Sequence, residues 1–202
     1  MTTTTTKSKE IFIQEAIIET SRLILNEITH DDVEFIFKLW NDDIVSRWIG
    51  NRGINDLNGA HRWIDENPIL GYKRDGFGLW LVRIKETLEP IGMIGLVNRA
   101  QKVIRQDEIN IGFSLITGHR SKGYCYEAAK EVMEYAKKRN VHVVGSTHID
   151  NINSKKVLEK LGLIYHSSFS IPGFNGEYIL LVQEKDKELE GKEEKQEEER
   201  ND

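Results

Sequence analysis

The sequence predicts one mixed α/β domain, and three observations support this prediction. Segments whose apolar residues alternate every second position, as in strands, are interspersed with segments whose apolar residues recur every third or fourth position, as in helices. Some strand segments are joined by short turns and others by helices, so one sheet should contain both hairpins and crossovers and be mixed. The 202-residue chain has no internal repeat and no linker rich in Pro, Gly or Ser, so no second domain is expected.

The first three elements follow directly from this periodicity. The segment RLILNEI (residues 22–28) alternates apolar and polar side chains and predicts a strand. The segment THDDVEFIFKLWND (29–42) predicts a helix, because its apolar residues share one helical face and Thr29 or Asp31 can serve as the N-cap. A second, weaker helix is expected over DLNGAHRWIDE (56–66).

The middle of the chain predicts three strands, a long helix and a buried strand. FGLWLVRIKE (77–86) and PIGMIGLVNR (90–99) are strands separated by the turn-prone residues ETLEP, and DEINIGFSLI (107–116) is a further strand. The helix, over residues 124–139, has a core-facing stripe with charged residues outside it. The stripe consists of Ala128, Ala129, Val132, Met133 and Ala136. VHVVGSTHI (141–149), rich in β-branched residues, reads as a buried strand.

The last elements are a short helix and two strands. NSKKVLEKLG (153–162) predicts a helix that ends at Gly162, the residue type most common after a helix C-terminus. Strands over residues 163–169 and 178–184 complete the domain.

The two ends of the chain differ in composition from the region between them. Residues 1–19, with a run of threonines, and residues 185–202, which include EEKQEEERND, have few side chains to bury. Ordering them would cost entropy without compensating burial, so both are expected to be disordered or loosely ordered, around a domain over residues 20–184. From residue 184 onward there are ten acidic and five basic residues, which account for the whole net charge of −5. The rest of the chain is neutral, which removes the main support for nucleic-acid binding.

Composition also bears on location and on metals. No apolar run approaches the length that spans a membrane, and the first residues lack the apolar core of a secretory signal. The single cysteine, Cys125, excludes an internal disulfide framework and suits a reducing compartment, so a cytoplasmic protein is expected. The six histidines show no i, i+4 pair or other metal-ligand spacing, so no metal site is expected.

A basic turn leads directly into the long helix. GHRSKG (118–123) follows a strand and precedes the helix that starts at Tyr124. Helix N-termini bind anions through unpaired N–H groups, Gly123 would allow close backbone approach, and Arg120 and Lys122 add positive charge. The segment predicts a cradle for phosphate or pyrophosphate, although an ordinary surface turn can have the same pattern. It is not a Walker A loop, because Tyr124 stands where the lysine is required, and the three-glycine dinucleotide pattern is missing.

Two motifs at a characteristic separation resemble the GNAT superfamily of N-acetyltransferases, in particular the branch of ribosomal-protein N-terminal acetyltransferases. The pyrophosphate loop of that family, Arg/Gln-x-x-Gly-x-Gly/Ala, is matched by RSKGYC (residues 120–125). Its later signature, Asn-x-x-Ser followed by a helix ending Lys-Leu-Gly-Phe, is matched by NINS (151–154) and KLGL (160–163). With IGF on the preceding strand, the resemblance spans about residues 20–184.

The resemblance implies a fold and a co-substrate. The fold is a mostly antiparallel sheet of seven strands, splayed between strands 4 and 5 and flanked by about four helices. The co-substrate is acetyl-CoA, whose pantetheine arm would bind the backbone of Phe113, Ser114 and Leu115, with the thioester in the gap beside the strand VHVVGSTHI. Asn151 would hold the cofactor arm or its carbonyl, with Asn153 as the alternative. The residues that would wrap the pyrophosphate are Arg120, Ser121, Lys122, Gly123, Tyr124 and Cys125.

The sequence departs from the family pattern at four positions, of which Cys125, Leu163 and Leu158 are the first three. Cys125 stands where glycine or alanine is usual, and without an evident histidine partner its thiol is expected to pack rather than to act as a nucleophile. Leu163 replaces a phenylalanine in the core. The tyrosine that protonates the departing thiolate in many members would fall at Leu158, so that acid is absent. Ser154 or Tyr165 could substitute, although Ser154 could equally be only a helix cap.

Acetyl transfer to an amine needs a base and an acid. Family members often carry a carboxylate on the strand before IGF, and here that position is Asn110, which cannot take a proton. Glu108, two residues earlier on the same strand face, could act through a water or could be only the polar side of the strand. The candidate catalytic residues are Glu108, Asn110 and Ser154, with His148 as a further proton carrier. Trp48 follows the first helix, where this family lines its acceptor pocket.

We therefore expect an enzyme that transfers an acetyl group from acetyl-CoA to a primary amine by direct attack, without an acyl-enzyme. The acceptor would be a protein N-terminus or an amine-bearing small molecule. The protein would be a monomer or a homodimer, with no nucleic-acid or membrane partner. Two alternatives remain open: a non-catalytic acyl-CoA-binding sensor or interaction module, and a nucleotide-phosphate binder that takes ATP.

Overall fold

The computed structural model describes residues 15–50, 52–99, 102, 104–171 and 176–184. The threonine run and the acidic tail over residues 185–202 lie outside these ranges. Within the N-terminal segment, Ile18–Glu19 form a two-residue strand, β1, that pairs antiparallel with β2. The sheet therefore begins just before residue 20, where the sequence placed the start of the domain.

One mixed sheet of eight strands organises the fold, in the order β1-β2-β3-β4-β5-β6-β8-β7. The strands after β1 are β2 (Leu23–Glu27), β3 (Leu79–Ile84), β4 (Pro90–Val97), β5 (Glu108–Leu115), β6 (His142–His148), β7 (Leu163–Phe169) and β8 (Tyr178–Gln183). Neighbouring strands pair antiparallel except β5 and β6, which are parallel. The predicted mixed, mostly antiparallel sheet is confirmed, with eight strands instead of seven because two-residue β1 is too short to show a period.

In the part of the chain that the structure describes, six named α-helices surround the sheet, where the sequence predicted about four. They are α1 (Val33–Trp40), α2 (Asp43–Ile49), α3 (Leu57–Ile64), α4 (Leu70–Asp75), α5 (Tyr124–Lys138) and α6 (Ile152–Lys160). The Asp42 side chain caps α2 only two residues after α1 ends, so the two helices read as one segment. Between α3 and α4, the π-helical turn Asp65–Ile69 contains Pro68, a residue that normally stops a helix. These two features hid α2 and α4 from the periodicity.

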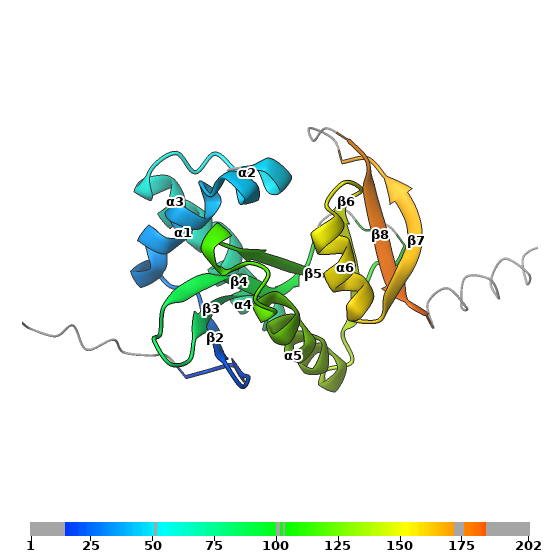
Figure 1. Ribbon diagram of the computed structural model, residues 1–202, viewed down its shortest axis with the longest axis horizontal. Coiled ribbons are helices and arrows are strands. Elements are labelled where there is room, and N and C mark those ends of the chain that lie inside the picture. Colours follow the sequence, from blue (N-terminus) through cyan, green and yellow to red (C-terminus); the bar gives the residue numbers. More distant parts are fainter. Residues whose placement is uncertain (1–14, 51, 100–101, 103, 172–175, 185–202) are drawn as a thin grey trace, which may run out of the picture.

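The helices cover both faces of the sheet (Figure 1). Helix α5 lies on one face, where Ala128, Ala129, Val132 and Ala136 are buried as the sequence predicted, and Met133 is partly buried. Helices α1 and α3 pack on the other face against Leu81 of β3 and Met93 of β4. The chain thus has its longest helix directly behind the strands that carry the predicted site. Among the described residues, no helix combines the length and apolarity needed to cross a membrane.

Candidate functional site

Strands β5 and β6 start side by side and then separate. They pair over residues 108–111 of β5 and 142–145 of β6. Beyond these pairs, β5 continues beside β4 as far as Leu115, whereas β6 continues beside β8 as far as His148. Figure 1 shows the two parts of the sheet turning away from each other at this point. The predicted splay is confirmed: its strands 4 and 5 are β5 and β6 once β1 is counted.

The residues predicted to hold the pantetheine arm lie on the diverging part of β5. Phe113 and Ser114 are half-buried, and the Leu115 side chain is buried in the core. Their partners in β4 are Ile94, Met93 and Gly92. These three residues come after the last β5–β6 pair, Ile111 with Gly145, so β6 no longer pairs with this part of β5. An extended pantetheine arm could form main-chain hydrogen bonds along this edge.

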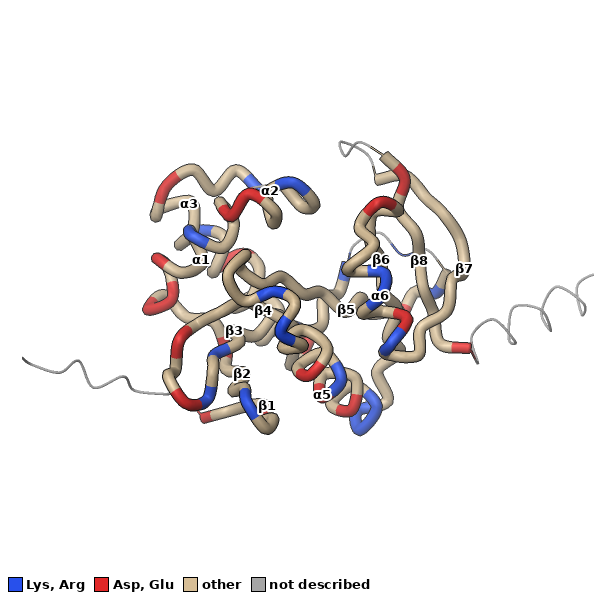
Figure 2. Tube along the Cα trace, viewed as in Figure 1, with Lys and Arg blue, Asp and Glu red and all other residues tan. Residues whose placement is uncertain are grey.

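The loop before α5 has the backbone that the sequence suggested. A short 3₁₀ turn over Thr117–His119 leads to Ser121 and Gly123, whose φ angles of 60° and 81° are in the left-handed region. Gly123 is the N-cap of α5 and, having no side chain, makes no side-chain cap hydrogen bond. Figure 2 shows basic positions in this loop and on α6. An exposed, glycine-capped helix N-terminus in a basic loop suits an anion.

Arg120 is held by protein groups on the strand side of the loop. Its Nε and Nη2 donate to the Leu115 carbonyl oxygen at 2.8 and 2.6 Å, and Nη2 also donates to Asp42 Oδ1 at 3.0 Å. Asp42 in turn accepts from Thr117 N and Thr117 Oγ1, both at 2.8 Å. Arg120 thereby ties the loop to the end of β5 and to the start of α2.

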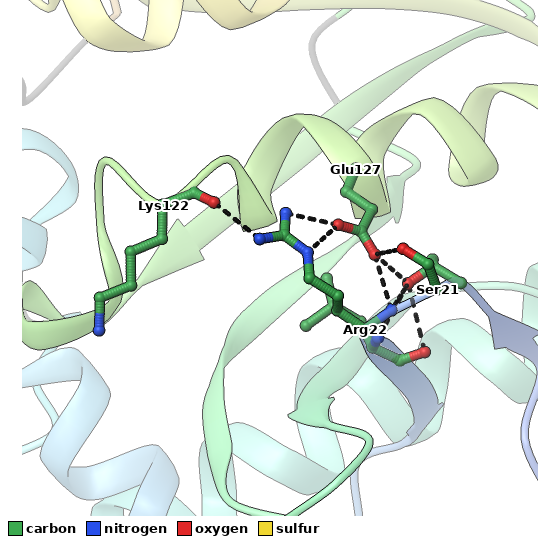
Figure 3. A network of polar contacts seen from close by, with 6 residues as sticks. Ser21, Arg22, Lys122 and Glu127 are labelled. Carbon is green, nitrogen blue, oxygen red and sulfur yellow. Dashed lines mark hydrogen bonds and ion pairs between the residues drawn. The ribbon is translucent and has the colours of Figure 1, made fainter.

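A second tie joins the same loop to residues just before β2, and nothing in the sequence pattern suggested it. Glu127, in the first turn of α5, accepts from Thr20 Oγ1 at 2.5 Å, from Ser21 Oγ at 3.1 Å and from the Arg22 backbone N–H at 3.0 Å. The Arg22 side chain donates from Nε to Glu127 Oε2 at 2.6 Å and from Nη1 to the Lys122 carbonyl at 3.1 Å. Figure 3 shows this network from close by. The partners are about a hundred residues apart, so only the fold reveals the contact.

Helix α6 begins at the end of β6 with a complete cap. Asn151 is the N-cap, and its Oδ1 accepts from the Ser154 backbone N–H at 3.2 Å. Asn153 is exposed, while Asn151 and Ser154 are half-buried. The Asn151 side chain also has a donating Nδ2 group, separate from the capping oxygen, so the cap does not exclude a hydrogen bond from Asn151 to a ligand.

A polar chain crosses between β5 and β6 where they separate. Ser146 Oγ donates to Asn110 Oδ1 at 3.0 Å and accepts from Arg99 Nη1 at 2.9 Å. Because Ile109 and Ile111 face the α5 side of the sheet, Asn110 points to the opposite face. The sequence motifs predicted a role for Asn110 but not for Ser146 or Arg99. A serine within an apolar strand was the available signal for Ser146.

Glu108 lies at the start of β5 and is almost fully buried, at 1% exposure. Its Oε2 accepts from the backbone N–H groups of Ile104 and Arg105 at 3.0 and 3.2 Å, and Oε1 is 3.8 Å from Arg99 Nη2. Burial lowers the pKa of Arg99, and the charge of Glu108 opposes this effect. These contacts favour a role in holding the loop before β5 and in orienting Arg99.

Three rings gather at the far end of β6. The His148 ring contacts two others: Trp48 of α2, tilted at 45° with centroids 5.5 Å apart, and Tyr178 of β8, edge-to-face at 78° with centroids 5.4 Å apart. Burial raises the pKa of the Tyr178 hydroxyl, and the nearby Arg52 charge partly offsets this. Trp48 thus reaches across the opening from α2 to β6. Tyr165 is far from this cluster, on the edge strand β7, where its hydroxyl pairs with Ser168 at 3.2 Å.

Cys125 is in the first turn of α5 and packs against the core. Burial raises the pKa of its thiol to about 12. A thiol with this pKa is protonated at neutral pH, in keeping with the packing role that the sequence suggested. Among the described residues, no group of three or more His, Cys, Asp or Glu side chains has a metal-binding arrangement.

Comparison with known proteins identifies the family. The Acetyltransferase (GNAT) domain model matches residues 22–164. YoaA of Bacillus subtilis strain 168, an uncharacterized N-acetyltransferase, is 32% identical over 152 residues, which cover 72% of this chain and 81% of YoaA.

Solved structures share the fold at low sequence identity. RimL, the ribosomal L7/L12 alpha-N-protein acetyltransferase in complex with coenzyme A, has a TM-score of 0.71 at 15% identity and covers 84% of this chain and 97% of its own. The ribosomal-protein-S5-alanine acetyltransferase from Vibrio fischeri has a TM-score of 0.68 at 19% identity, covering 83% and 96%. With the family model matched over most of the domain, the chain belongs to the GNAT family of acetyltransferases, the family and enzyme class that its motifs predicted.

Proposed function

We propose that the protein transfers the acetyl group of acetyl-CoA to a primary amine. One observation carries the proposal: β5 and β6 separate immediately beside a helix, α5, that starts at an uncapped glycine in a basic loop. Membership of the GNAT family and the coenzyme A bound to RimL support acetyl-CoA as the donor.

The cofactor-binding assignment follows the two sides of the opening. The backbone of Phe113, Ser114 and Leu115 binds the pantetheine arm, with Asn151 or Asn153 across the opening at the start of α6. The loop residues Arg120, Ser121, Lys122, Gly123, Tyr124 and Cys125 hold the pyrophosphate. In this assignment the backbone N–H groups at the start of α5 supply most of the contacts, because the Arg120 guanidinium is bonded to Leu115 and Asp42.

The chemistry is a direct attack. The neutral amine nitrogen bonds to the acetyl carbon, the carbon–sulfur bond breaks, the thiolate leaves with the bonding electrons, and the new amide nitrogen releases one proton. The candidates for moving this proton are Glu108, Asn110 with Ser146, Ser154 and His148. Asn110 carries no proton-accepting group, so its part is to orient Ser146, to which it is bonded. Glu108 would act through a water, because its Oε2 accepts two backbone N–H groups and its Oε1 lies 3.8 Å from Arg99 Nη2.

The acceptor is an amine on a protein N-terminus or on a small molecule. Trp48, His148 and Tyr178 form an aromatic wall at the end of β6, on the side of the opening reached by α2. The ribosomal-protein acetyltransferases among the fold neighbours favour a protein α-amine.

The first experiment is a calorimetric titration of the full chain with acetyl-CoA, CoA and ATP. We expect both CoA species to bind and ATP not to bind. A panel of primary amines, including peptides with free N-termini, is then screened for thiol release from acetyl-CoA. No binding of either CoA species would reject the proposal. Binding without thiol release for any amine would favour a non-catalytic acyl-CoA sensor. The buried Leu158, at the position of the family's usual tyrosine acid, is the feature that favours this alternative.

A further inference from the structure

The residues just before β2 are bound to the first turn of α5 through one carboxylate, that of Glu127. This carboxylate is 18% exposed and forms a 2.6 Å ion pair with Arg22 Nη2, in addition to its hydrogen bonds with Thr20, Ser21 and Arg22. Glu127 also donates its backbone N–H to the Gly123 carbonyl at 3.0 Å, the first hydrogen bond of α5. Glu127 thus contacts Gly123 through its backbone and residues 20–22 through its side chain.

Arg22 fixes the direction of one peptide group in the loop. Its Nη1 donates to the Lys122 carbonyl oxygen at 3.1 Å. In a trans peptide the C=O and the following N–H point in opposite directions, so this bond turns the Gly123 N–H away from Arg22. The guanidinium also lies over the Tyr124 ring, 4.5 Å from its centroid, and Nη2 is 3.4 Å from where a Cβ on Gly123 would be. Arg22 therefore contacts Lys122 and Tyr124, and its guanidinium lies beside Gly123 between them.

The pair also balances charge at this helix N-terminus. A lone carboxylate in the first turn of α5 would repel a phosphate bound at the same end of the helix. Burial raises the pKa of Glu127, but the hydrogen bonds from Thr20, Arg22 and Ser21 outweigh it and hold the pKa below its ordinary value of 4.5. Glu127 is ionised at neutral pH, and the positive charge of Arg22 offsets it.

We infer that Arg22 and Glu127 are positioning residues for the phosphates of the donor: they set the loop over residues 120–123 and turn the first N–H groups of α5 toward the pyrophosphate. The inference rests on the proposed function. The pair acts through the loop and does not touch the thioester. Its loss should weaken binding of the phosphate-bearing part of the donor and leave the chemistry at the thioester unchanged.

The test compares two donors, acetyl-CoA and S-acetylpantetheine, which carries the same thioester without the pyrophosphate. For Arg22→Ala we expect KM for acetyl-CoA and Kd for CoA to rise about tenfold, the effect of one lost charge-assisted contact. We expect kcat at saturating acetyl-CoA, and kcat/KM for S-acetylpantetheine, to stay at the wild-type level. Arg22→Lys keeps the positive charge, but an ammonium group cannot bond to Glu127 and to the Lys122 carbonyl at once as a guanidinium does. Its Kd for CoA and KM for acetyl-CoA should therefore lie between those of the wild type and Arg22→Ala.

A double variant separates charge from folding. In Arg22→Ala the unpaired Glu127 carboxylate repels the phosphates, so adding Glu127→Gln should recover part of the lost CoA affinity. The matched control is Arg74→Ala, which removes the 2.6 Å ion pair of Arg74 with Asp75 at the end of α4, a pair that shares no residue with the Arg22–Glu127 network. This control variant should leave the kinetic constants with both donors, and the Kd for CoA, at the wild-type level. Should Arg22→Ala not fold, as judged by thermal melting, Arg22→Lys carries the test.

The outcomes distinguish the inference from the proposed function. If the wild-type protein neither binds CoA nor releases thiol, the proposed function is rejected and the inference with it. If the wild type does both, the inference alone is overturned by Arg22→Ala with unchanged CoA affinity, or by equal losses with the two donors. A selective loss with acetyl-CoA, partly recovered in the double variant, supports it.

Discussion

Helices α5 and α6 each follow one of the two diverging strands, yet their N-termini are completed in opposite ways. The α6 N-terminus is closed by its own N-cap, Asn151, whose side chain accepts the Ser154 N–H. The α5 N-terminus begins at Gly123, which has no side chain to offer. Since every helix leaves its first N–H groups without intrahelical partners, α6 satisfies part of this need itself, whereas α5 is left to satisfy it from outside. The contrast teaches that an anion site is defined as much by the missing cap as by nearby positive charge.

The two helices also differ in what holds them. The start of α6 is stabilised by a hydrogen bond between Asn151 and Ser154, which are only three residues apart in sequence. The α5 start is held by residues from distant parts of the chain, Arg22 on one side and Asp42 through Arg120 on the other. The α6 cap is therefore a local contact, whereas the loop before α5 depends on tertiary contacts for its shape. Mutations can therefore separate the two helices experimentally.

The largest effect is expected at Gly123. An aspartate there must adopt a φ of 81°, a strained angle for a residue with a side chain, and it brings a negative charge to the loop that we propose holds the pyrophosphate. We expect Gly123→Asp to weaken acetyl-CoA binding by about a hundredfold or more, the sum of strain and charge repulsion. Calorimetric titration measures this directly.

The matched control is Gly162→Asp at the other end of α6. Gly162 has a similar φ of 84°, and no atom lies within 4 Å of an added Cβ. The strain is comparable, about 1–2 kcal/mol of unfolding free energy, but no phosphate site is nearby. The melting temperature should fall in both variants and CoA affinity only in Gly123→Asp. Equal losses of affinity would contradict the assignment of the loop.

The next effect concerns Asp42, which anchors the loop before α5. Its carboxylate, 11% exposed, accepts from Thr117, from Arg120 and from the first turn of α2. Asn has one accepting oxygen where the carboxylate has two, so Asp42→Asn should lower the free energy of unfolding by about 2 kcal/mol at pH 7. Urea titration measures the difference.

The pH dependence of the free energy of unfolding of the same variant tests the role of the negative charge on Asp42. Burial raises the pKa of the carboxyl, but hydrogen bonds from Thr117 and Val45 and the charge of Arg120 hold it below the ordinary value of 3.8. A carboxyl whose pKa is lower in the folded than in the unfolded state stabilises the folded protein at pH values above the unfolded-state pKa. This contribution is lost as the pH falls through the folded-state pKa. The advantage of wild type over Asp42→Asn should therefore be constant near pH 7 and shrink below pH about 3.8. A difference that persists unchanged at pH 2–3 would contradict this account.

The α6 side gives a smaller effect. Asn151→Ala removes the cap and should lower the free energy of unfolding by about 1 kcal/mol. Asn151→Asp keeps an accepting oxygen for the Ser154 N–H and replaces the donating amide N–H₂ by a second, negatively charged oxygen. If Asn151 also donates to the cofactor, Asn151→Asp should keep the stability and lose CoA affinity. Wild-type affinity in Asn151→Asp would assign Asn151 to the cap alone.

The sequence located most elements of this fold because their burial is periodic. The predicted strand at residues 163–169 coincides with β7, and Gly162 ends α6 with the left-handed φ expected of it. Helices α2 and α4 escaped prediction because a two-residue break after α1 and Pro68 interrupt the pattern. Periodicity reports which face is buried, and it says little about short helices that meet end to end.

The site was predictable only where its residues are close in sequence. The loop over residues 120–123 carries a local signature, and the left-handed Gly123 follows from it. The contacts that shape the loop join Arg22 with Glu127 and Asp42 with Arg120, pairs separated by 105 and 78 residues. No single-sequence pattern encodes such pairs, because each partner alone is an ordinary surface charge. The same holds for Ser146, whose partners come from β5 and from the segment after β4.

The smallest effect, and the last way to sharpen the comparison, is at Cys125 in the first turn of α5. A helix N-terminus normally lowers a thiol pKa, yet burial raises that of Cys125 to about 12. At pH 8 the thiolate fraction should be about 10⁻⁴, so an aromatic disulfide reagent should label the folded protein about a hundredfold or more slower than the urea-unfolded protein. Fast labelling of the folded protein would mean that α5 stabilises a thiolate of its own. Slow labelling is the expected result, and it would mean that Cys125 places no negative charge of its own at this N-terminus.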